Sequence, residues 1–219
     1  MLPAIPLLLL LASTTSALPQ ETRTITAGSP DPSDEPSYTR TDDFKDAMLT
    51  THNRFRSEHS APDLKWNDTL ADSSTSHLDD VATSSGCEFE HSDAPYGENL
   101  ALGYPNASAG VVAWGDERRD YDFGRGEFDE STGHFTQMVW RDTSDVGCGR
   151  KVCGGDGDGD GGGRWFLVCQ YWPRGNVVGS FTEMVQRPRD GVDIGNAAGA
   201  VGPRGWWLGL VVIFGVYLS

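Results

Sequence analysis

The order of patterns along the chain predicts an α+β domain, in which helices come first and strands come late. Apolar residues recur at helical spacing through the first half of the chain. The clearest strand pattern, Trp165–Tyr171, lies near the end. Helices and strands do not alternate regularly, which is typical of an α+β or layered sandwich arrangement.

Four stretches have the spacing of amphipathic helices. The first follows Asp42 and Asp43, whose carboxylates suit the first turn of a helix. Ser131 or Thr132 is the expected N-cap of the fourth. The residues that define the four faces are, in order, Phe44, Ala47, Met48, Thr51 and Phe55; Leu70, Ala71, Ser74, His77, Leu78 and Val81; Val111, Trp114, Glu117 and Tyr121; and His134, Met138 and Arg141.

Two late segments are expected to form a β-hairpin. Trp165–Tyr171 alternates as a strand does, and Val146–Val152 can pair with it. The connecting stretch Gly154–Gly163 is rich in Gly and Asp, and Asp156–Gly161 copies the opening of a calcium-binding loop. The twelfth position of that loop is Leu167 instead of glutamate, so we expect a flexible acidic hairpin and no calcium site.

The N-terminal end carries an export signal. Leu7–Ala12 is apolar, too short to span a bilayer, and followed by small residues. This pattern predicts a signal peptide, residues 1–17, cleaved after Ala17.

The C-terminal end carries a second apolar segment, Trp206–Leu218, preceded by small residues and a short spacer. The pattern predicts a GPI-anchor signal with attachment at Asn196, or alternatively at Gly195 or Gly199. A tail anchor, or a tail that packs on a partner, is the competing interpretation. Together the two ends predict a protein that is secreted or attached to the cell surface.

Composition divides the rest of the chain. Residues 18–41 are rich in Pro, Ser, Thr, Asp and Glu and predict a disordered linker. Residues 42–187 amount to one domain, residues 188–205 form a Gly/Ala-rich linker, and residues 206–219 form the tail. The formal net charge of −15 argues against nucleic acid or anionic lipid as the main partner.

An exported protein can form disulfides through its cysteines and be glycosylated at its asparagines. The four cysteines are an even number, which predicts two disulfides with three possible pairings. Asn67 and Asn106 each begin a glycosylation sequon and are expected at the surface.

Known catalytic motifs are missing from the sequence: it has no G-x-S-x-G elbow, no H-E-x-x-H helix and no P-loop. The candidates for chemistry are therefore among five histidines. His91 and His134 stand in suggestive settings, whereas His52, His59 and His77 are expected to be helix-surface or packing residues.

The segments around the two candidate histidines resemble the CAP superfamily, which comprises the cysteine-rich secretory, antigen 5 and plant pathogenesis-related proteins. Gly133–Trp140 resembles its first signature and Phe166–Val177 its second. The remaining matches, all in the family's order, are His91-Ser92, Gly97–Leu100, the helix with Trp114, Glu117 and Tyr121, and His52-Asn53, Leu64, Trp66, Leu70 and Ala71. The resemblance covers residues 42–187 and is nearest to the secreted, sterol-binding fungal branch.

The resemblance implies a three-layer α-β-α sandwich with two histidines and two acidic residues in a cleft. Carried over by motif, these are His91, Glu98, Glu117 and His134. Imidazoles with nearby carboxylates suit Zn²⁺ or another divalent cation, and carboxylates can also orient the imidazoles from outside the metal. The alternative is a hydrogen-bonded network that only locks the layers together.

The resemblance also implies the disulfides Cys87–Cys153 and Cys148–Cys169, the second of which would join two neighbouring strands. Relatives often carry a further bridge whose cysteine corresponds to Thr132, so that bridge is absent here.

Three functions follow as hypotheses. The resemblance implies binding of sterols, or of fatty-acid-like molecules, through the segment Leu100–Trp114, with Tyr104, Pro105 and Val111 as ligand-binding residues. For Val111 the alternative is an ordinary core position. A metal-assisted or His/Glu-based protease, with Glu98 or Glu117 as general base, ranks lower because no nucleophile is evident. A surface adhesion protein that contacts host or cell-wall components is the third hypothesis.

Overall fold

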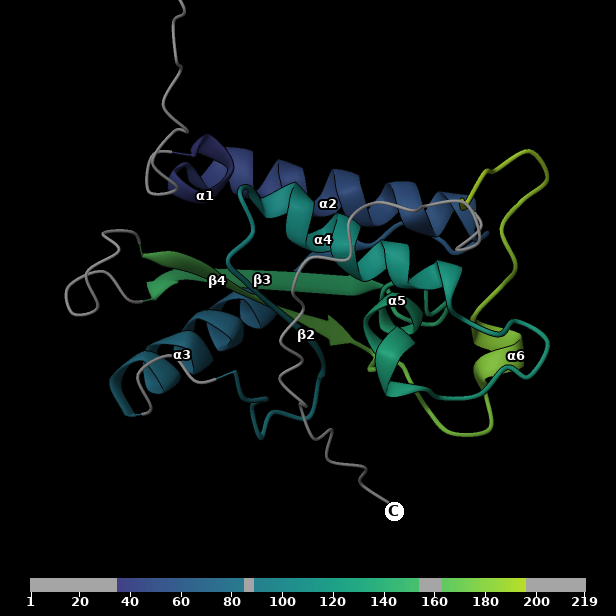
Figure 1. The fold of residues 1–219 in the computed structure, drawn as a ribbon. Coiled ribbons are helices and arrows are strands. Elements are labelled where there is room, and N and C mark those ends of the chain that lie inside the picture. Colours follow the sequence, from purple (N-terminus) through teal and green to yellow (C-terminus); the bar gives the residue numbers. More distant parts are fainter. Residues whose placement is uncertain (1–34, 85–88, 154–162, 196–219) are drawn as a thin grey trace, which may run out of the picture.

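The computed structural model describes residues 35–84, 89–153 and 163–195, and it has the predicted α+β architecture (Figure 1). Its centre is a four-stranded sheet in the order β1-β3-β4-β2. The strands are β1 (Lys65–Trp66), β2 (Gly97–Leu102), β3 (Asp145–Cys153) and β4 (Arg164–Trp172). β1 runs parallel to β3, and β4 lies antiparallel to both β3 and β2.

Helices cover both faces of the sheet, so the predicted three-layer sandwich is confirmed. α3 (Asp68–Ser84) lies on one face, and α1 (Pro36–Thr39), α2 (Thr41–Glu58) and α4 (Ala107–Asp116) lie on the other (Figure 1). α5 (Gly133–Met138) and α6 (Phe181–Met184) lie at one end of the sheet. Two 3-10 turns, η2 (Glu117–Arg119) and η3 (Glu130–Thr132), precede α5.

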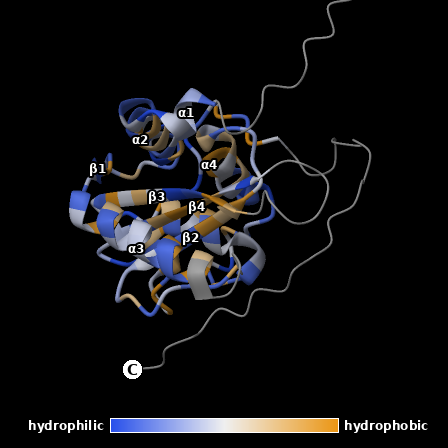
Figure 2. Ribbon diagram, turned by 90° about the vertical axis from the view of Figure 1, so that its left-hand side faces the viewer, coloured by the Kyte–Doolittle hydropathy of each residue, from blue (hydrophilic) through white to orange (hydrophobic). Residues whose placement is uncertain are grey.

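Alternate residues of β4 supply the two cores between the layers, because successive side chains of a strand point to opposite faces. Leu167, Cys169 and Tyr171 belong to the larger apolar cluster, which includes α2 and α4. Phe166 and Val168 belong to the smaller cluster beneath α3. Hydrophobic colour accordingly follows β4 and α4 through the middle of the molecule (Figure 2).

Glycines of β3 let α3 approach the sheet closely. A Cβ at Gly147 would lie 2.2 Å from the backbone nitrogen of Ala71 and 2.4 Å from the carbonyl oxygen of Asn67. A Cβ at Gly149 would lie 2.8 Å from the nitrogen of Thr75. The helix therefore rests directly on the strand backbone, with Ser74 Oγ donating to the Gly147 carbonyl at 3.0 Å.

A buried arginine joins α2 to the chain between α5 and β3. Arg56 is fully buried, and its guanidinium donates to the carbonyls of Pro62, Met138, Trp140 and Thr143 at 2.5 to 2.9 Å. Burial lowers the pKa of Arg56 to about 10, so it remains charged at neutral pH. Four backbone acceptors thus offset the cost of burying this charge.

The third and fourth helices are shorter than the sequence pattern predicts. α4 ends at Asp116 and the chain tightens into η2, so that Tyr121 lies beyond the helix and packs against Phe135, 5.8 Å away between ring centroids. α5 ends at Met138, which leaves Arg141 outside it. The physical reason at α5 is that Arg56 takes the carbonyl of Met138, which another helical turn would have used.

Folded structure extends into both segments for which linkers are predicted. Residues 35–41, expected in a disordered linker, form α1 and the start of α2, with Tyr38 buried in the larger cluster. At the other end, the nitrogen of Arg189 donates to the Glu58 carbonyl and Arg119 Nε donates to the Ile194 carbonyl. A single buried tyrosine has no helical or strand periodicity, so composition alone could not show that the folded domain begins before residue 42.

The strands and one disulfide agree with prediction. β3 and β4 pair in antiparallel fashion, with Cys148 directly opposite Cys169, and these two cysteines form a disulfide. The other predicted pair includes Cys87, which lies outside the described residues, as does the acidic hairpin at residues 154–162.

The structure describes the two predicted glycosylation sites but not the two predicted terminal signals. Asn67 and Asn106 are half-buried and cap the starts of α3 and α4, where their side chains accept backbone N–H groups. Their glycosylation stays a prediction. Among the described residues, no helix has the length and apolar character needed to cross a membrane. The signal peptide, Asn196 and the apolar tail lie outside that part of the chain.

We predict that Gly147→Ala destabilises the fold, because its new Cβ meets the backbone of α3, which cannot rotate away as a side chain could. The expected loss is about 1–3 kcal/mol or more, the usual cost of overpacking. Urea unfolding measures it. Gly124→Ala, at an exposed turn where the nearest atom is a side-chain oxygen of Asp122, is the control and should change stability little. Equal stability of the two variants would contradict the close approach of α3.

Candidate functional site

Two of the four predicted site residues form a first histidine–carboxylate pair. His91 Nδ1 donates to Glu98 Oε1 at 2.8 Å. Glu98 lies on β2, and its side chain is only 6% exposed. His91 comes from the segment that precedes β2 and is 22% exposed. The pair therefore holds an imidazole near the surface on a carboxylate that is almost completely buried.

Glu98 is surrounded by donors. Ser92 donates its backbone N–H to Oε1 and its hydroxyl to Oε2, at 2.9 and 2.6 Å. Gln170, directly opposite on β4, donates from Nε2 to Oε2 at 2.9 Å. Burial alone would raise the pKa of Glu98, but the hydrogen bonds from His91, Gln170 and Ser92 outweigh it and lower the pKa to about 2. Glu98 is thus a fixed anion, and the proton of His91 faces it on Nδ1.

The other two predicted residues form a second pair of the same kind. His134 Nδ1 donates to Glu117 Oε1 at 2.6 Å, and the backbone N–H of Phe135 donates to Glu117 Oε2 at 3.0 Å. Glu117 begins η2 and His134 lies in the first turn of α5. The imidazole stacks on the ring of Trp114, 6.1 Å away between ring centroids. In both pairs Nδ1 is used, so Nε2 is the nitrogen that could ligate a metal.

A buried network positions the backbone of His134. Asn99 Nδ2 donates to the His134 carbonyl at 3.1 Å and to the Tyr171 hydroxyl at 3.2 Å. Tyr171 in turn donates to His52 Nε2 at 2.8 Å, and His52 Nδ1 donates to the Met48 carbonyl at 2.7 Å. Burial lowers the pKa of His52 to about 4, so it is neutral at pH 7, as this pattern of donors requires. The prediction that His52 is a packing residue is therefore confirmed.

The four residues do not form one cluster of metal ligands. Across residues 35–84, 89–153 and 163–195, no group of three or more His, Cys, Asp or Glu side chains is arranged to hold a metal ion. Each carboxylate is committed to its own histidine. The geometry favours carboxylates that orient the imidazoles over four direct ligands, because the carboxylate oxygens already accept two or more hydrogen bonds.

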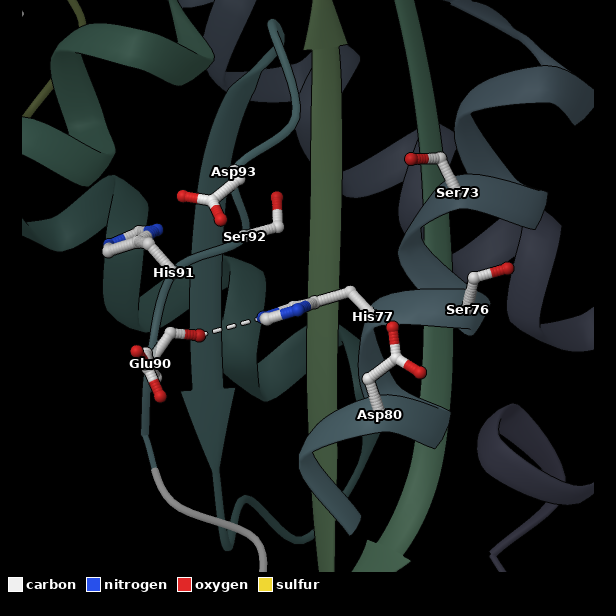
Figure 3. A pocket seen from close by; sticks show the side chains of 8 residues that line it. All are labelled: Ser73, Ser76, His77, Asp80, Glu90, His91, Ser92 and Asp93. Atoms are coloured by element: carbon white, nitrogen blue, oxygen red, sulfur yellow. Dashed lines mark hydrogen bonds between the residues drawn. The ribbon is translucent and has the colours of Figure 1, made fainter. Parts of the chain in front are cut away.

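A pocket of about 380 Å³ lies between α3 and the segment before β2 (Figure 3). His77 crosses it from α3 and donates from Nε2 to the Glu90 carbonyl at 2.7 Å, while the ring of His91 points away from His77. The lining is otherwise hydroxyl and carboxylate groups: Ser73, Ser76, Asp80, Ser92 and Asp93. Such a polar lining does not suit an apolar ligand.

The predicted lipid-binding segment is mostly regular structure. Leu100–Leu102 belongs to β2 and residues from Ala107 onward belong to α4, which leaves a turn of four residues. In this turn Pro105 is exposed and Tyr104 is half-buried against the larger cluster. Val111 is completely buried on the inward face of α4, in the larger cluster, as the alternative of a core position expects; its contact with a ligand stays a prediction.

The family is decided by comparison with known sequences. The sequence model of the cysteine-rich secretory protein family, CAP, matches residues 49–171, which is more than half of the chain. The chain belongs to the CAP family. The predicted resemblance is therefore confirmed, and the two His–Glu pairs lie in or beside its signature segments.

Two fungal relatives place this CAP protein in the fungal branch. It is 43% identical over 145 residues to Protein PRY2 of Saccharomyces cerevisiae, covering 65% of this chain and 41% of that protein. It is 33% identical over 165 residues to Secreted protein RBT4 of Candida albicans, covering 74% of this chain and 43% of that protein. The chain thus spans less than half the length of either relative.

Solved structures agree on the fold. The CAP domain matches Schistosoma mansoni venom allergen-like protein 4 with a TM-score of 0.50 and 21% identity, covering 66% of this chain and 94% of that structure. At this level of identity the likeness concerns the fold alone.

Sequence reasoning missed Gln170, Ser92 and Asn99 as the residues that position the pairs. A signal was present for Gln170, which is the one amide in the apolar run Phe166–Trp172. A polar side chain at such a position must have a partner, and its partner is Glu98, the residue opposite it in the sheet.

We predict that Glu98→Gln destabilises the CAP domain at pH 7 by about 1–3 kcal/mol, because an amide N–H₂ would then face a donor. The lowered pKa of Glu98 also makes the stability of the domain depend on pH. The stabilisation by ionised Glu98 is complete above the ordinary value of 4.5 and is lost as the pH falls towards 2.

Urea unfolding at pH 7, 4.5 and 3 tests both statements. The wild-type protein should lose stability between pH 4.5 and 3 more steeply than Glu98→Gln. Glu130→Gln, at an exposed position, is the control and should follow the wild type. Parallel pH profiles for wild type and Glu98→Gln would show that the carboxylate is not held in this way.

Proposed function

We propose that this CAP protein acts outside the cell by binding small hydrophobic ligands, sterols foremost, and does not act as an enzyme. The observation that carries the proposal is the turn between β2 and α4. There Pro105 is exposed and Tyr104 is half-buried against the larger apolar cluster. An apolar ligand bound at this turn would extend a core that is already formed. The predicted signal peptide and the relative named as secreted support an extracellular location.

Hydrolysis is the weaker alternative on chemical grounds. A general base works best with a pKa near the operating pH, whereas hydrogen bonds lower the pKa of Glu98 to about 2. Both carboxylates also hold their own histidines by hydrogen bonds. No thiol is free among the described cysteines, so no thiol nucleophile accompanies the pairs.

The His–Glu pairs offer some, but not all, of the ligands that a divalent cation such as Zn²⁺ requires. His91 and His134 are imidazoles oriented by carboxylates, which is the usual setting of zinc-binding histidines. The described residues offer no third protein ligand nearby, so other ligands would have to be water. We therefore propose weak, exchangeable binding at the histidines, in which a metal would supply a positive charge and Glu98 and Glu117 would be orienting groups.

The lipid proposal predicts saturable binding of labelled cholesterol to the purified protein. Tyr104→Ala should weaken binding by about tenfold, the effect expected from losing one buried aromatic contact. Tyr96→Ala, a half-buried tyrosine before β2, is the matched control and should bind as the wild type does. His134→Ala should also leave binding unchanged, because the His–Glu pairs take no part.

Three outcomes would change the conclusion. Loss of binding in His134→Ala would place the ligand at the His–Glu pairs. Cleavage of casein that is sensitive to chelator and lost in His134→Ala would favour a protease. If neither binding nor cleavage occurs, a surface adhesion role gains support.

The metal proposal predicts weak binding of Zn²⁺ to the chelator-treated protein, measured by calorimetry. His91→Ala and His134→Ala should each lower the affinity by about tenfold or more, because each removes one of two imidazoles. His77→Ala, whose Nε2 already bonds the Glu90 carbonyl, is the control and should retain the wild-type affinity. Unchanged affinity in both His91→Ala and His134→Ala would remove the metal from these pairs.

A further inference from the structure

The N-terminal helix α1 covers the same turn at which we place the ligand. Tyr38 is 1% exposed, and its ring stacks on Trp165 with ring centroids 4.7 Å apart and planes inclined by 12°. Its hydroxyl donates to the Tyr104 carbonyl at 3.3 Å. A flat aromatic ring from the N-terminal segment is therefore inserted beside Tyr104.

Two further contacts fasten α1 over the turn. The backbone N–H of Ala107, at the start of α4, donates to Ser37 Oγ at 3.1 Å. The guanidinium of Arg150, on β3, donates to the Tyr38 carbonyl. All of these contacts are made by side chains or by single backbone groups, and none of them is part of the sheet.

The connection between α1 and the rest of the domain permits it to swing outward. Arg40 is the one residue between α1 and α2, and its backbone is extended, with φ −105° and ψ 126°. No side chain caps the start of α2 there. The match to the CAP family begins at residue 49, within α2, so α1 lies outside it. Detaching α1 would break no strand pairing and no helix of the CAP core.

The space that Tyr38 fills is suited to a flat apolar ring. One wall is the face of Trp165, and the backbone carbonyl of Tyr104 lies at the hydroxyl end of the ring. The ring of Tyr104 continues inward to α4, where a Cβ at Gly110 would lie 3.8 Å from Tyr104 and 3.1 Å from Leu167. Both Tyr104 and Trp165 pack against the larger apolar cluster. Apolar spaces of this kind accept apolar guests when a side chain is removed from them.

We propose that Tyr38 occupies a binding slot for planar hydrophobic rings, between Trp165 and Tyr104, and that α1 is a strap which such a ligand must displace. The inference rests on the proposed lipid-binding function and adds both the entry point of the ring system and the segment that competes for it. Only the open state binds the ligand. The apparent affinity is therefore the affinity of the open state multiplied by the fraction of molecules that are open.

The first test compares cholesterol binding by full-length wild type, Tyr38→Ala and Ser37→Ala. Removing the competing ring should tighten binding by about tenfold or more, as expected if the strap is closed in over nine-tenths of the molecules. Ser37→Ala, which keeps the tyrosine and loses the hydrogen bonds of the hydroxyl with Ala107 and Glu35, should tighten binding by a smaller factor. Trp172→Ala, an exposed aromatic on β4, is the control and should change nothing. Equal or weaker binding by both strap variants would overturn the proposal.

The second test follows the strap itself. Trypsin cleaves after Arg40 only when the backbone there opens locally. Saturating cholesterol should accelerate that cut in the wild type several-fold, as read by mass spectrometry. A ligand that binds while the rate at Arg40 stays constant would show that α1 is not displaced.

The third test separates the slot from the lipid function. p-Cresol reproduces the side chain of tyrosine and should raise the melting temperature of Tyr38→Ala while leaving that of the wild type unchanged. If no protein binds cholesterol and p-cresol rescues Tyr38→Ala, the lipid function fails and the slot stands. If cholesterol binds without p-cresol rescue, the ligand lies elsewhere and the slot is wrong.

Discussion

The buried guanidinium of Arg56 is the constraint on which the arrangement of the site depends. It is anchored in α2 and bonds four backbone carbonyls, three of which lie at the end of α5 and beyond it. Without these bonds the carbonyl of Met138 would be buried and unsatisfied, at a cost of about 1–3 kcal/mol. The helix that carries His134 therefore ends where Arg56 holds it.

The same rule, that buried polar groups must have partners, accounts for the two His–Glu pairs. α5 is held at its end by Arg56 and at its start by Asn99, which bonds the carbonyl of His134. Glu117 is held by the same helix through the N–H of Phe135. The first pair is built separately on β2, where Gln170 and Ser92 surround Glu98. Each imidazole thus has its tautomer set by an ionised or hydrogen-bonded neighbour before any ligand arrives.

The two faces of the sheet serve different chemistry. On the α3 face the polar groups of Glu98 and Gln170 lie near a hydrophilic pocket. On the opposite face the apolar cluster reaches the surface at Tyr104, where the strap α1 covers it. The alternation of β4 side chains separates these environments by one residue along the strand. The turn at Tyr104 and the His91–Glu98 pair consequently lie at distinct places, and substitutions can test them one at a time.

The sequence by itself determined the α+β class and the strand pair, since these are expressed in local periodicity. The Cys148–Cys169 bridge and the four candidate site residues came from the resemblance of its motifs to a family. Helix ends were predicted poorly, because at α5 the end is set by Arg56, which lies 82 residues away from Met138. Only the tertiary structure decided that the site is two His–Glu pairs, that Val111 belongs to the core and that Tyr38 belongs to the folded domain. These are contacts between segments distant along the chain, and the order of residues carries no measure of which of them will meet.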